Sequence, residues 1–378
     1  VYTWSPGSGN TVIDGQIALQ PGGNRIFATL WDGNGIDTDD LSAYSTNLTI
    51  DLTPGGYSVF SAAQLADLDQ FSADPARIAR GNIFNALQFN GDLRSLIENA
   101  IGGSGNDTIT GNVVANTLQG GWGNDTLYGG NGDDDLNGGL DVDEVYGGSG
   151  NDTFRVIDFN FIDDVYGGSD NDTLDLAGHS RSMIVNLGTG IWQTDLGAEG
   201  PQTVSSIETV IGSGNDDTIT GTFGTQTFYG GNGNDTFVVG DGEFYDSVAG
   251  GSGNDTLDHS ATSQAGGTFN FLLGTYAGGF ANGTINFSSI ETYRDGTGGN
   301  TIISAAGNTT YFGNGGDDTM VASSGGETMY GGAGNDIADL SVGDFTYTFD
   351  TETGLDVVFI NELFLGFETF LFGAANDT

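Results

Sequence analysis

Apolar residues recur every nine positions over much of the chain, each inside a glycine-rich frame. From Gly120 the sequence reads GGWGNDTLY, GGNGDDDLN, GGLDVDEVY and GGSGNDTFR, which gives the frame G-G-x-G-x-D-x-U-x, where U is a large apolar residue. A single apolar residue between polar neighbours indicates a short strand that buries one face. The glycines allow backbone conformations that residues with a Cβ avoid, so each strand is joined to the next by a tight turn. The pattern predicts an all-β repeat protein.

Two nonapeptides make one coil of a flattened spiral, so the sixth-position residues of alternate nonapeptides stack along two edges. One edge of the first block carries Asp107, Asp125 and Asp143, and the other carries Asn116, Asp134 and Asp152. Spacings of eleven and then nine residues occur twice, at Asp152–Asp163–Asp172 and at Asp235–Asp246–Asp255. We interpret both as coils with a two-residue insertion.

Spacers without the frame separate three blocks of repeats. Each spacer ends in an apolar residue followed by a glutamate, which predicts a shared structural hydrogen bond where a spacer meets a block, at Glu98, Glu208, Glu291 and Glu368. Alternation of apolar and polar residues inside the spacers predicts strands. Only Ser61 to Phe71 and Ile83 to Ile97, both in the first spacer, have patterns that predict short helices.

The predicted fold is all-β, with parallel β-roll blocks that alternate with β-sandwich-like spacer sheets. The predicted parts are an N-terminal segment (1–31) that ends an upstream region, spacer 1 (32–100), roll 1 (101–175), spacer 2 (176–210), roll 2 (211–258), spacer 3 (259–294), roll 3 (295–339), spacer 4 (340–371) and the start of a further repeat (372–378). We therefore expect the chain to be a segment of a longer polypeptide.

The charge of the chain is strongly negative, with 51 acidic residues against seven basic ones, all of them Arg, and a net charge of -44. This balance excludes direct binding to nucleic acid, which needs clustered Lys and Arg, and argues against anionic membrane surfaces. The chain has no Cys, hence no disulfides, and no apolar run of the ~18 residues that a spanning helix needs. Apolar residues make up 37% of the chain, so a disordered acidic tail is a poor interpretation.

The stacked aspartates predict cation sites between successive coils. Two carboxylates and several turn carbonyls converge there, and an irregular cage of oxygen ligands suits calcium better than zinc or magnesium. The candidate ligands in the repeats are Asp107, Asp125, Asp134, Asp143, Asp152, Asp163, Asp172, Asp217, Asp235, Asp246, Asp255, Asp318 and Asp336. The frame itself resembles the calcium-binding RTX repeat, whose fold is a parallel β-roll.

The first third of the chain resembles the junction region of serralysins, secreted zinc metalloproteases whose catalytic domain precedes an RTX roll. The resemblance rests on Trp31-Asp32-Gly33-Asn34-Gly35-Ile36-Asp37-Thr38, Asp40-Leu41-Ser42-Ala43-Tyr44 and Ile97-Glu98-Asn99-Ala100-Ile101 with the repeat that follows. It implies a further calcium site near the junction, with Asp32 and Asp37 as ligands, although Asn34 stands where the family has Gly. It also implies type I secretion and folding outside the cell.

The enzyme of that family does not follow from the resemblance. Its zinc signature is H-E-x-x-H-x-x-G-x-x-H, whereas this chain has only His179 and His259, far apart in the sequence and at ordinary spacer positions. A catalytic zinc needs three protein ligands and a general base. We therefore expect no catalytic residues in this chain. The aromatic run from Leu363 to Phe372 predicts a buried strand, with a partner-docking edge as the alternative.

Two classes of function remain open. The first is a non-catalytic extracellular scaffold, such as a surface layer, adhesin or filament, which self-associates or binds a cell surface or matrix. The second is the accessory C-terminal region of a serralysin-like protease. In both, calcium is the cofactor, and the rolls fold when they meet it outside the cell.

Overall fold

The structure is a computed structural model in which two compact units are formed by Val1–His179 with Gly197–Ile207 and by Ser180–Leu196 with Glu208–Thr378. It describes residues 1–31, 33–68, 78–157, 163–195, 200–222, 224–239, 247–263, 265–278, 285–305, 307–323, 327–340, 349–353 and 357–360. The described backbone consists of strands, turns and two short 3₁₀ turns, which confirms the all-β prediction. None of its helices is long and apolar enough to cross a membrane.

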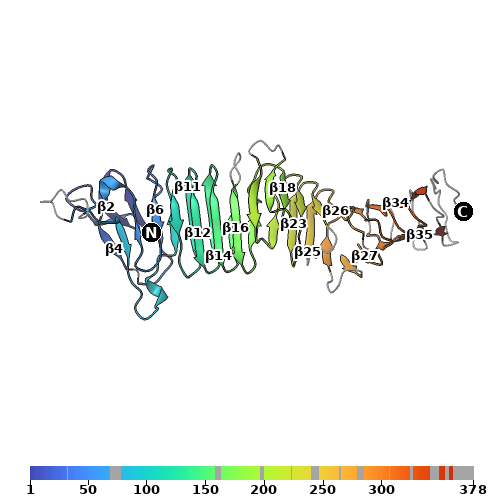
Figure 1. Cartoon of the computed structure of the whole chain (residues 1–378), viewed down its shortest axis with the longest axis horizontal. Helices are drawn as coiled ribbons and strands as arrows, with labels where there is room; N and C mark the ends of the chain where they lie inside the picture. The colour runs from blue at the N-terminus through green and yellow to red at the C-terminus, as the bar shows by residue number, and fades with distance from the viewer. Residues whose placement is uncertain are drawn as a thin grey trace. The chain divides into compact units, whose positions relative to one another are not determined.

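The first unit contains two sheets of parallel strands that alternate along the chain (Figure 1). One sheet runs in the order β1 (Tyr2–Ser5), β5 (Thr38–Asp40), β9 (Asn99–Ile101), β11 (Thr117–Trp122), β13 (Asp135–Leu140), β15 (Thr153–Arg155) and β17 (Thr173–Asp175). The other runs in the order β6 (Thr49–Asp51), β10 (Thr108–Thr110), β12 (Thr126–Asn131), β14 (Glu144–Ser149), β16 (Asp164–Ser169) and β20 (Gln202–Ser205). A chain that passes from one parallel sheet to the other in every coil is a parallel β-roll.

The apolar residue of each nonapeptide points inward and stacks on its equivalents in neighbouring coils. Leu118 pairs with Leu136 and Leu127 pairs with Val145, which are equivalent residues of successive coils. Val145 pairs with Val165, two residues later than a regular coil would place its partner, which confirms the two-residue insertion before Asp172. The resulting core is at most 2% exposed in these columns, namely Ala100, Leu118, Leu136, Phe154 and Leu174 on one sheet and Ile50, Ile109, Leu127, Val145, Val165 and Val204 on the other.

The turns between strands need glycine at the second and fourth positions of the frame. Gly130 and Gly132 have φ of 113° and 102°, a region that glycine enters without steric cost. Asp141 and Asp170 stand at the fourth position and still adopt φ of 83° and 84°. Asp141 compensates in part, since its Oδ2 accepts a hydrogen bond of 3.1 Å from the Gly123 N–H in the preceding coil.

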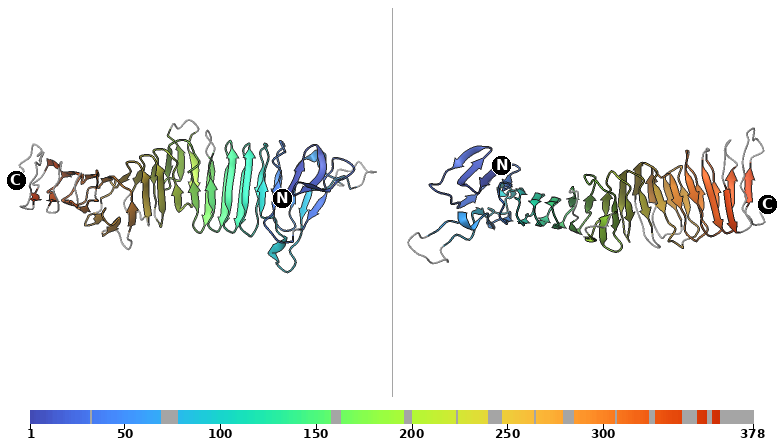
Figure 2. Two further views of the ribbon diagram at one scale, coloured as in Figure 1. Left: turned by 180° about the vertical axis from the view of Figure 1, so that it is seen from behind. Right: turned by 90° about the horizontal axis from the view of Figure 1, so that it is seen from above.

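The second unit repeats this architecture with two further columns of parallel strands, seen from other sides in Figure 2. One column is β18 (Met183–Asn186), β22 (Thr218–Thr220), β24 (Thr236–Val238), β26 (Thr256–Asp258), β30 (Thr292–Arg294), β32 (Thr310–Phe312), β34 (Thr328–Ala333) and β36 (Phe349–Thr353), with β19 (Ile191–Thr194) antiparallel to β18. The other contains β21 (Thr209–Ile211), β23 (Thr227–Asn232) and β25 (Ser247–Ser252), then β31 (Thr301–Ile303), β33 (Thr319–Val321), β35 (Ile337–Leu340) and β37 (Val357–Ile360).

The spacer of the second unit joins the sheet of the roll and does not form a sandwich of its own. Its strands are β27 (Thr268–Asn270), β28 (Thr275–Ala277) and β29 (Ile285–Ser288), which form an antiparallel meander. At one end β29 pairs in parallel with β25, and at the other β27 pairs in parallel with β31. The sheet therefore continues through the spacer, because parallel pairing at both borders satisfies the edges of the neighbouring coils. The boundaries of the nine predicted parts stay predictions.

The N-terminal part of the first unit adds strands to the roll and carries a small separate sheet. β2 (Ser8–Ile13) and β3 (Gln16–Leu19) extend β1 in antiparallel fashion. The separate sheet consists of β4 (Ala28–Leu30), β8 (Ile83–Asn85) and β7 (Tyr57–Ser58).

The prediction of short helices in this part is wrong. The described residues of Ser61 to Phe71 contain only the 3₁₀ turn η1 (Ala62–Gln64), and residues 69–71 lie outside them. The segment Ile83 to Ile97 contains β8 and the 3₁₀ turn η3 (Leu93–Ser95). Backbone groups of β8 pair with two strands, and Asn90 and Gly91 take positive φ of 54° and 73°, which a helix does not tolerate.

Candidate metal-binding columns

Twelve sixth-position aspartates belong to the described residues, and each is at most 2% exposed. They are Asp107, Asp125, Asp134, Asp143, Asp152, Asp163, Asp172, Asp217, Asp235, Asp255, Asp318 and Asp336. Asp246 and Asp32 lie outside the described residues. Carboxylates are rarely this buried unless they are paired or bind metal, so the burial of a whole set requires an explanation.

One oxygen of each stacked carboxylate binds the backbone of the coil before it. Asp125 Oδ1 accepts a hydrogen bond of 2.6 Å from the Asp107 N–H, and Asp143 Oδ1 accepts one of 2.7 Å from the Asp125 N–H. The same bond recurs in both columns of the first unit and in the second unit, at Asp134, Asp152, Asp163, Asp172, Asp235, Asp255, Asp318 and Asp336. The two-edge stacking expected from the sequence is therefore confirmed.

The second oxygen of these carboxylates is buried without a protein donor. Among the described residues, Oδ2 accepts no hydrogen bond at six positions, namely Asp125, Asp134, Asp152, Asp235, Asp255 and Asp318. A buried oxygen that carries charge and lacks a donor is costly, so each of these atoms has the surroundings of a metal ligand.

The first glycine of the frame leaves room for that oxygen. A Cβ at Gly129 would lie 2.3 Å from Asp134 Oδ2 and 2.7 Å from the carbonyl oxygen of Gly147 in the next coil. At Gly120 the corresponding distances are 2.3 Å to Asp125 Oδ2 and 2.3 Å to the Gly138 carbonyl. A carboxylate oxygen and a main-chain carbonyl of the following coil thus converge at each turn, where only glycine fits.

Burial without a counter-ion raises the pKa of these carboxyl groups, because desolvation disfavours the charged form. The pKa rises to about 8 at Asp125 and Asp318 and to about 7 at Asp134 and Asp235, and neighbouring carboxylates add to the effect. The backbone N–H donors act in the opposite direction and are too weak to cancel the desolvation. A cation next to the free oxygen would restore the charged form.

The donor set fits calcium. The converging atoms are carboxylate and carbonyl oxygens, the hard ligands that calcium takes in irregular geometry. Within the described residues no three or more His, Asp or Glu side chains gather as a metal-binding group, so any site there is completed by main-chain carbonyls. That the individual aspartates ligate calcium remains a proposal.

Amide side chains replace the carboxylate in the second repeats of the first two blocks. Asn116 Oδ1 accepts a hydrogen bond of 2.7 Å from the Asn112 N–H, and Gln226 Oε1 accepts one of 3.0 Å from the Thr222 N–H. Asp107 and Asp217 make the same contact through Oδ2, to Gly103 and Ser213. These four residues bind their own turn, which distinguishes them from the aspartates with a free Oδ2.

The junction candidates are only partly described. Asp37 is partly buried, and its backbone N–H donates a hydrogen bond of 2.8 Å to Glu98 Oε2. Asn34 adopts φ of 131°, so it keeps the conformation expected of the family's glycine. Glu98 makes the structural hydrogen bond predicted for the spacer ends.

Glu291 has a role that the repeat frame missed. Its Oε2 accepts a hydrogen bond of 2.9 Å from the Asp255 N–H, the bond that a sixth-position aspartate makes elsewhere. The recurring apolar-Glu pair was the signal for it. In roll 3 the frame also hides an exchange, since Asp295 stands at the first position and Asn300 at the sixth. Asn300 Nδ2 donates to both carboxylate oxygens of Asp295 at 3.0 Å.

Both histidines are buried at structural positions. His259 Nδ1 lies 3.2 Å from the Tyr293 hydroxyl, which donates to Asp295 Oδ1 at 3.1 Å. Burial lowers the pKa of His259 to about 3. His179 is 3% exposed, and its backbone N–H donates to the Leu176 carbonyl.

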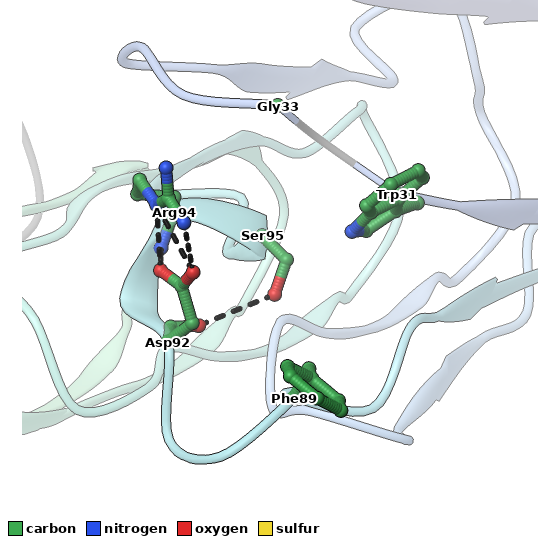
Figure 3. Close-up of a pocket in the computed structure, with 6 residues that line it drawn as sticks. All are labelled: Trp31, Gly33, Phe89, Asp92, Arg94 and Ser95. Atoms are coloured by element: carbon green, nitrogen blue, oxygen red, sulfur yellow. Dashed lines mark hydrogen bonds and ion pairs between the residues drawn. The ribbon is translucent and has the colours of Figure 1, made fainter.

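A surface cavity of about 360 Å³ lies apart from these columns, in the first unit. Trp31, Gly33, Phe89, Asp92, Arg94 and Ser95 line it, with the two aromatic rings on one side and the polar residues on the other (Figure 3). The sequence analysis missed it, because it assigned Phe89 to Ser95 to a helix.

Comparison with known proteins agrees with the repeat pattern. The family described as RTX calcium-binding nonapeptide repeat (4 copies) matches residues 101–136, 119–154, 211–243, 241–261 and 303–338. The repeats are therefore RTX repeats, a calcium-binding type.

Several proteases are similar to part of the chain. Serralysin of Photorhabdus laumondii is 38% identical over 96 residues, 25% of this chain and 15% of the relative. Serralysin G of Dickeya chrysanthemi is 32% identical over 118 residues, 31% of this chain and 19% of the relative. Metalloprotease AprA of Pseudomonas entomophila is 34% identical over 96 residues, 25% and 15% respectively. The chain thus spans less than a fifth of the length of these relatives.

Proposed function

We propose that this chain is a calcium-triggered folding scaffold of a secreted protein, without catalytic residues of its own. The observation that carries the proposal is the set of buried carboxylate oxygens without a protein donor, repeated at successive coils. A single such atom is a local oddity, whereas a periodic column indicates one cation chemistry used many times.

The residues of each coil divide the work. Oδ1 of a sixth-position aspartate holds the N–H of the preceding coil, and Oδ2 with the glycine carbonyl of the next coil would hold the cation. Bound calcium supplies positive charge and a flexible oxygen coordination shell. The protein residues then exclude water and fix the glycine turns, whose ordering is otherwise costly in entropy.

Folding and cation binding are then one coupled equilibrium. Extracellular calcium modules bind at ~0.1–1 mM, far above cytosolic calcium, so the rolls would stay unfolded inside the cell and fold outside it. We infer an extracellular location and a type I secretion route on this ground and on the resemblance to serralysins.

Circular dichroism tests the coupling. In excess EDTA the β-sheet signal should be lost, and calcium chloride should restore it while magnesium chloride at equal concentration does not. The decisive control is ionic strength, matched with sodium chloride. A spectrum that is the same in EDTA and in calcium would contradict the proposal.

The second candidate is the accessory region of a serralysin-like protease, favoured by the similarity to three proteases. Continued roll-and-sheet modules beyond the first roll favour a surface layer, adhesin or filament. Reading the gene upstream of Val1 for the zinc signature, and imaging the purified protein for ordered assemblies, distinguishes the two.

A further inference from the structure

Two aromatic side chains in the first unit are far more exposed than such residues usually are. Trp31 is 77% exposed and Phe89 is 81% exposed, and both line the cavity of about 360 Å³. Isolated apolar residues on a surface need no explanation, but two large rings at one cavity mark a binding site. The volume lies at the low end of the range for small-molecule sites.

The wall opposite the rings is polar and held in place (Figure 3). Arg94 Nε donates to Asp92 Oδ1 at 2.9 Å and to Oδ2 at 3.0 Å, and Arg94 Nη2 donates to Oδ2. The Asp92 carboxylate also accepts the Arg94 N–H at 3.1 Å as the N-cap of η3. Such bidentate pairs fix side-chain geometry, and a guanidinium has further N–H donors for a ligand.

We propose that this cavity binds a neutral saccharide of one or two rings. A sugar has an apolar C–H face, which stacks on aromatic rings, and a rim of hydroxyls, which donate to a carboxylate and accept from a guanidinium. The cavity offers both kinds of surface on facing walls. The proposal does not depend on calcium ligation at any particular aspartate, since no sixth-position residue lines the cavity.

Other occupants match the cavity less well. A phosphorylated or carboxylated ligand would meet a chain with a net charge of -44 and an arginine already paired with Asp92. A purely apolar ligand would strip water from the Asp92–Arg94 pair and give it no new partner, which is costly. A neutral ligand rich in hydroxyls avoids both costs.

The test uses the full chain, folded in calcium, on an array of neutral oligosaccharides built from glucose, galactose, mannose and N-acetylglucosamine. A bound saccharide is then titrated by isothermal calorimetry into four variants. We expect Trp31→Ala and Phe89→Ala to weaken binding at least about tenfold, and Asp92→Asn to weaken it by a similar factor. Trp122→Ala removes an equally large ring, 65% exposed, from β11 and should leave binding unchanged.

Each outcome decides the proposal. Failure of every array saccharide to bind overturns it, as does equal loss of binding in Trp31→Ala and Trp122→Ala. If Trp31→Ala changes only the sedimentation coefficient, the rings join two copies of the chain and the saccharide site is refuted. Circular dichroism of each variant in calcium and in EDTA shows that the β-rolls still fold, so this test fails or succeeds separately from the calcium proposal.

Discussion

Replacing Asp134 by asparagine should change stability in opposite directions with and without calcium. Asparagine keeps the shape of the side chain and the oxygen that accepts the Asn116 N–H at 2.7 Å. It removes the negative charge on the buried Oδ2, which has no protein donor. Asn116 shows that an amide is tolerated at a sixth position, since its Oδ1 accepts the Asn112 N–H and its Nδ2 donates to the Glu98 carbonyl.

Without calcium the substitution should stabilise the fold. Burial raises the pKa of Asp134 from 3.8 to about 7, so the folded state prefers the protonated form. That contribution to stability is fully present below about pH 4 and is lost as the pH rises towards 7. Three pKa units correspond to roughly 4 kcal/mol, and solvent relaxation around a partly accessible turn reduces this to about 2 kcal/mol at pH 7.5. Asparagine should regain that amount.

With calcium the same substitution should destabilise the fold. A site with a Kd of ~0.1–1 mM contributes roughly 1.4–2.7 kcal/mol of stability at about 10 mM calcium. Loss of the charged ligand removes most of that contribution, and twice as much is lost if the carboxylate serves two neighbouring sites.

The assay is far-UV circular dichroism under two conditions. Urea unfolding is followed in calcium, and folding driven by trimethylamine N-oxide is followed in EDTA, because that osmolyte favours compact states. Glu144→Gln is the control, since it removes one exposed charge from β14 in the same roll. The reasoning is refuted if Asp134→Asn moves both midpoints in the same direction, or if Glu144→Gln reproduces its effects.

Three further predictions concern the turns and the pH. Gly129→Ala places a methyl group 2.3 Å from Asp134 Oδ2, so it should abolish calcium-induced folding or raise its calcium midpoint severalfold, whereas Gly22→Ala, which meets no atom within 4 Å, should not; equal midpoints in a calcium titration would contradict this. Asp170→Gly should stabilise the calcium-bound protein by about 1 kcal/mol in urea unfolding, because Asp170 adopts φ of 84°, and a destabilised variant would show that its carboxylate matters more than its backbone. In EDTA, lowering the pH from about 8 to about 5 should increase the β-sheet signal, because the raised pKa values of Asp125, Asp134, Asp235 and Asp318 make protonation stabilise the folded state; a signal that falls on acidification would contradict it.

The nonapeptide frame predicted the coils because its signals agree at every level. Glycine, aspartate and one apolar residue each have a single structural task, so periodicity alone located the inward columns and the stacked aspartates. The two-residue insertion before Asp172 could also be predicted, since the spacing on both sides kept its phase.

The N-terminal part could not be predicted in the same way. The apolar residues between Ile83 and Ile97 fit a helical period, yet β8 forms because β4 and β7 offer strand partners far away in the sequence. The cavity at Trp31 and Phe89 brings together residues that are distant in the sequence, on loops that no local pattern places. The exchange of Asp295 and Asn300 was visible in the frame but required the geometry to interpret.

The carboxylate columns have a direction. Each aspartate holds the N–H of the coil before it, so the last coil of a roll depends on an acceptor supplied by the segment that follows. In the second unit Glu291, beyond the meander of β27 to β29, supplies it for Asp255. A fragment cut directly after β26 would therefore end on an uncapped amide, while one extended through β30 would carry its own terminator. The natural cutting points for dissecting or recombining these modules thus lie after each spacer's glutamate, one segment later than the nonapeptide pattern marks them.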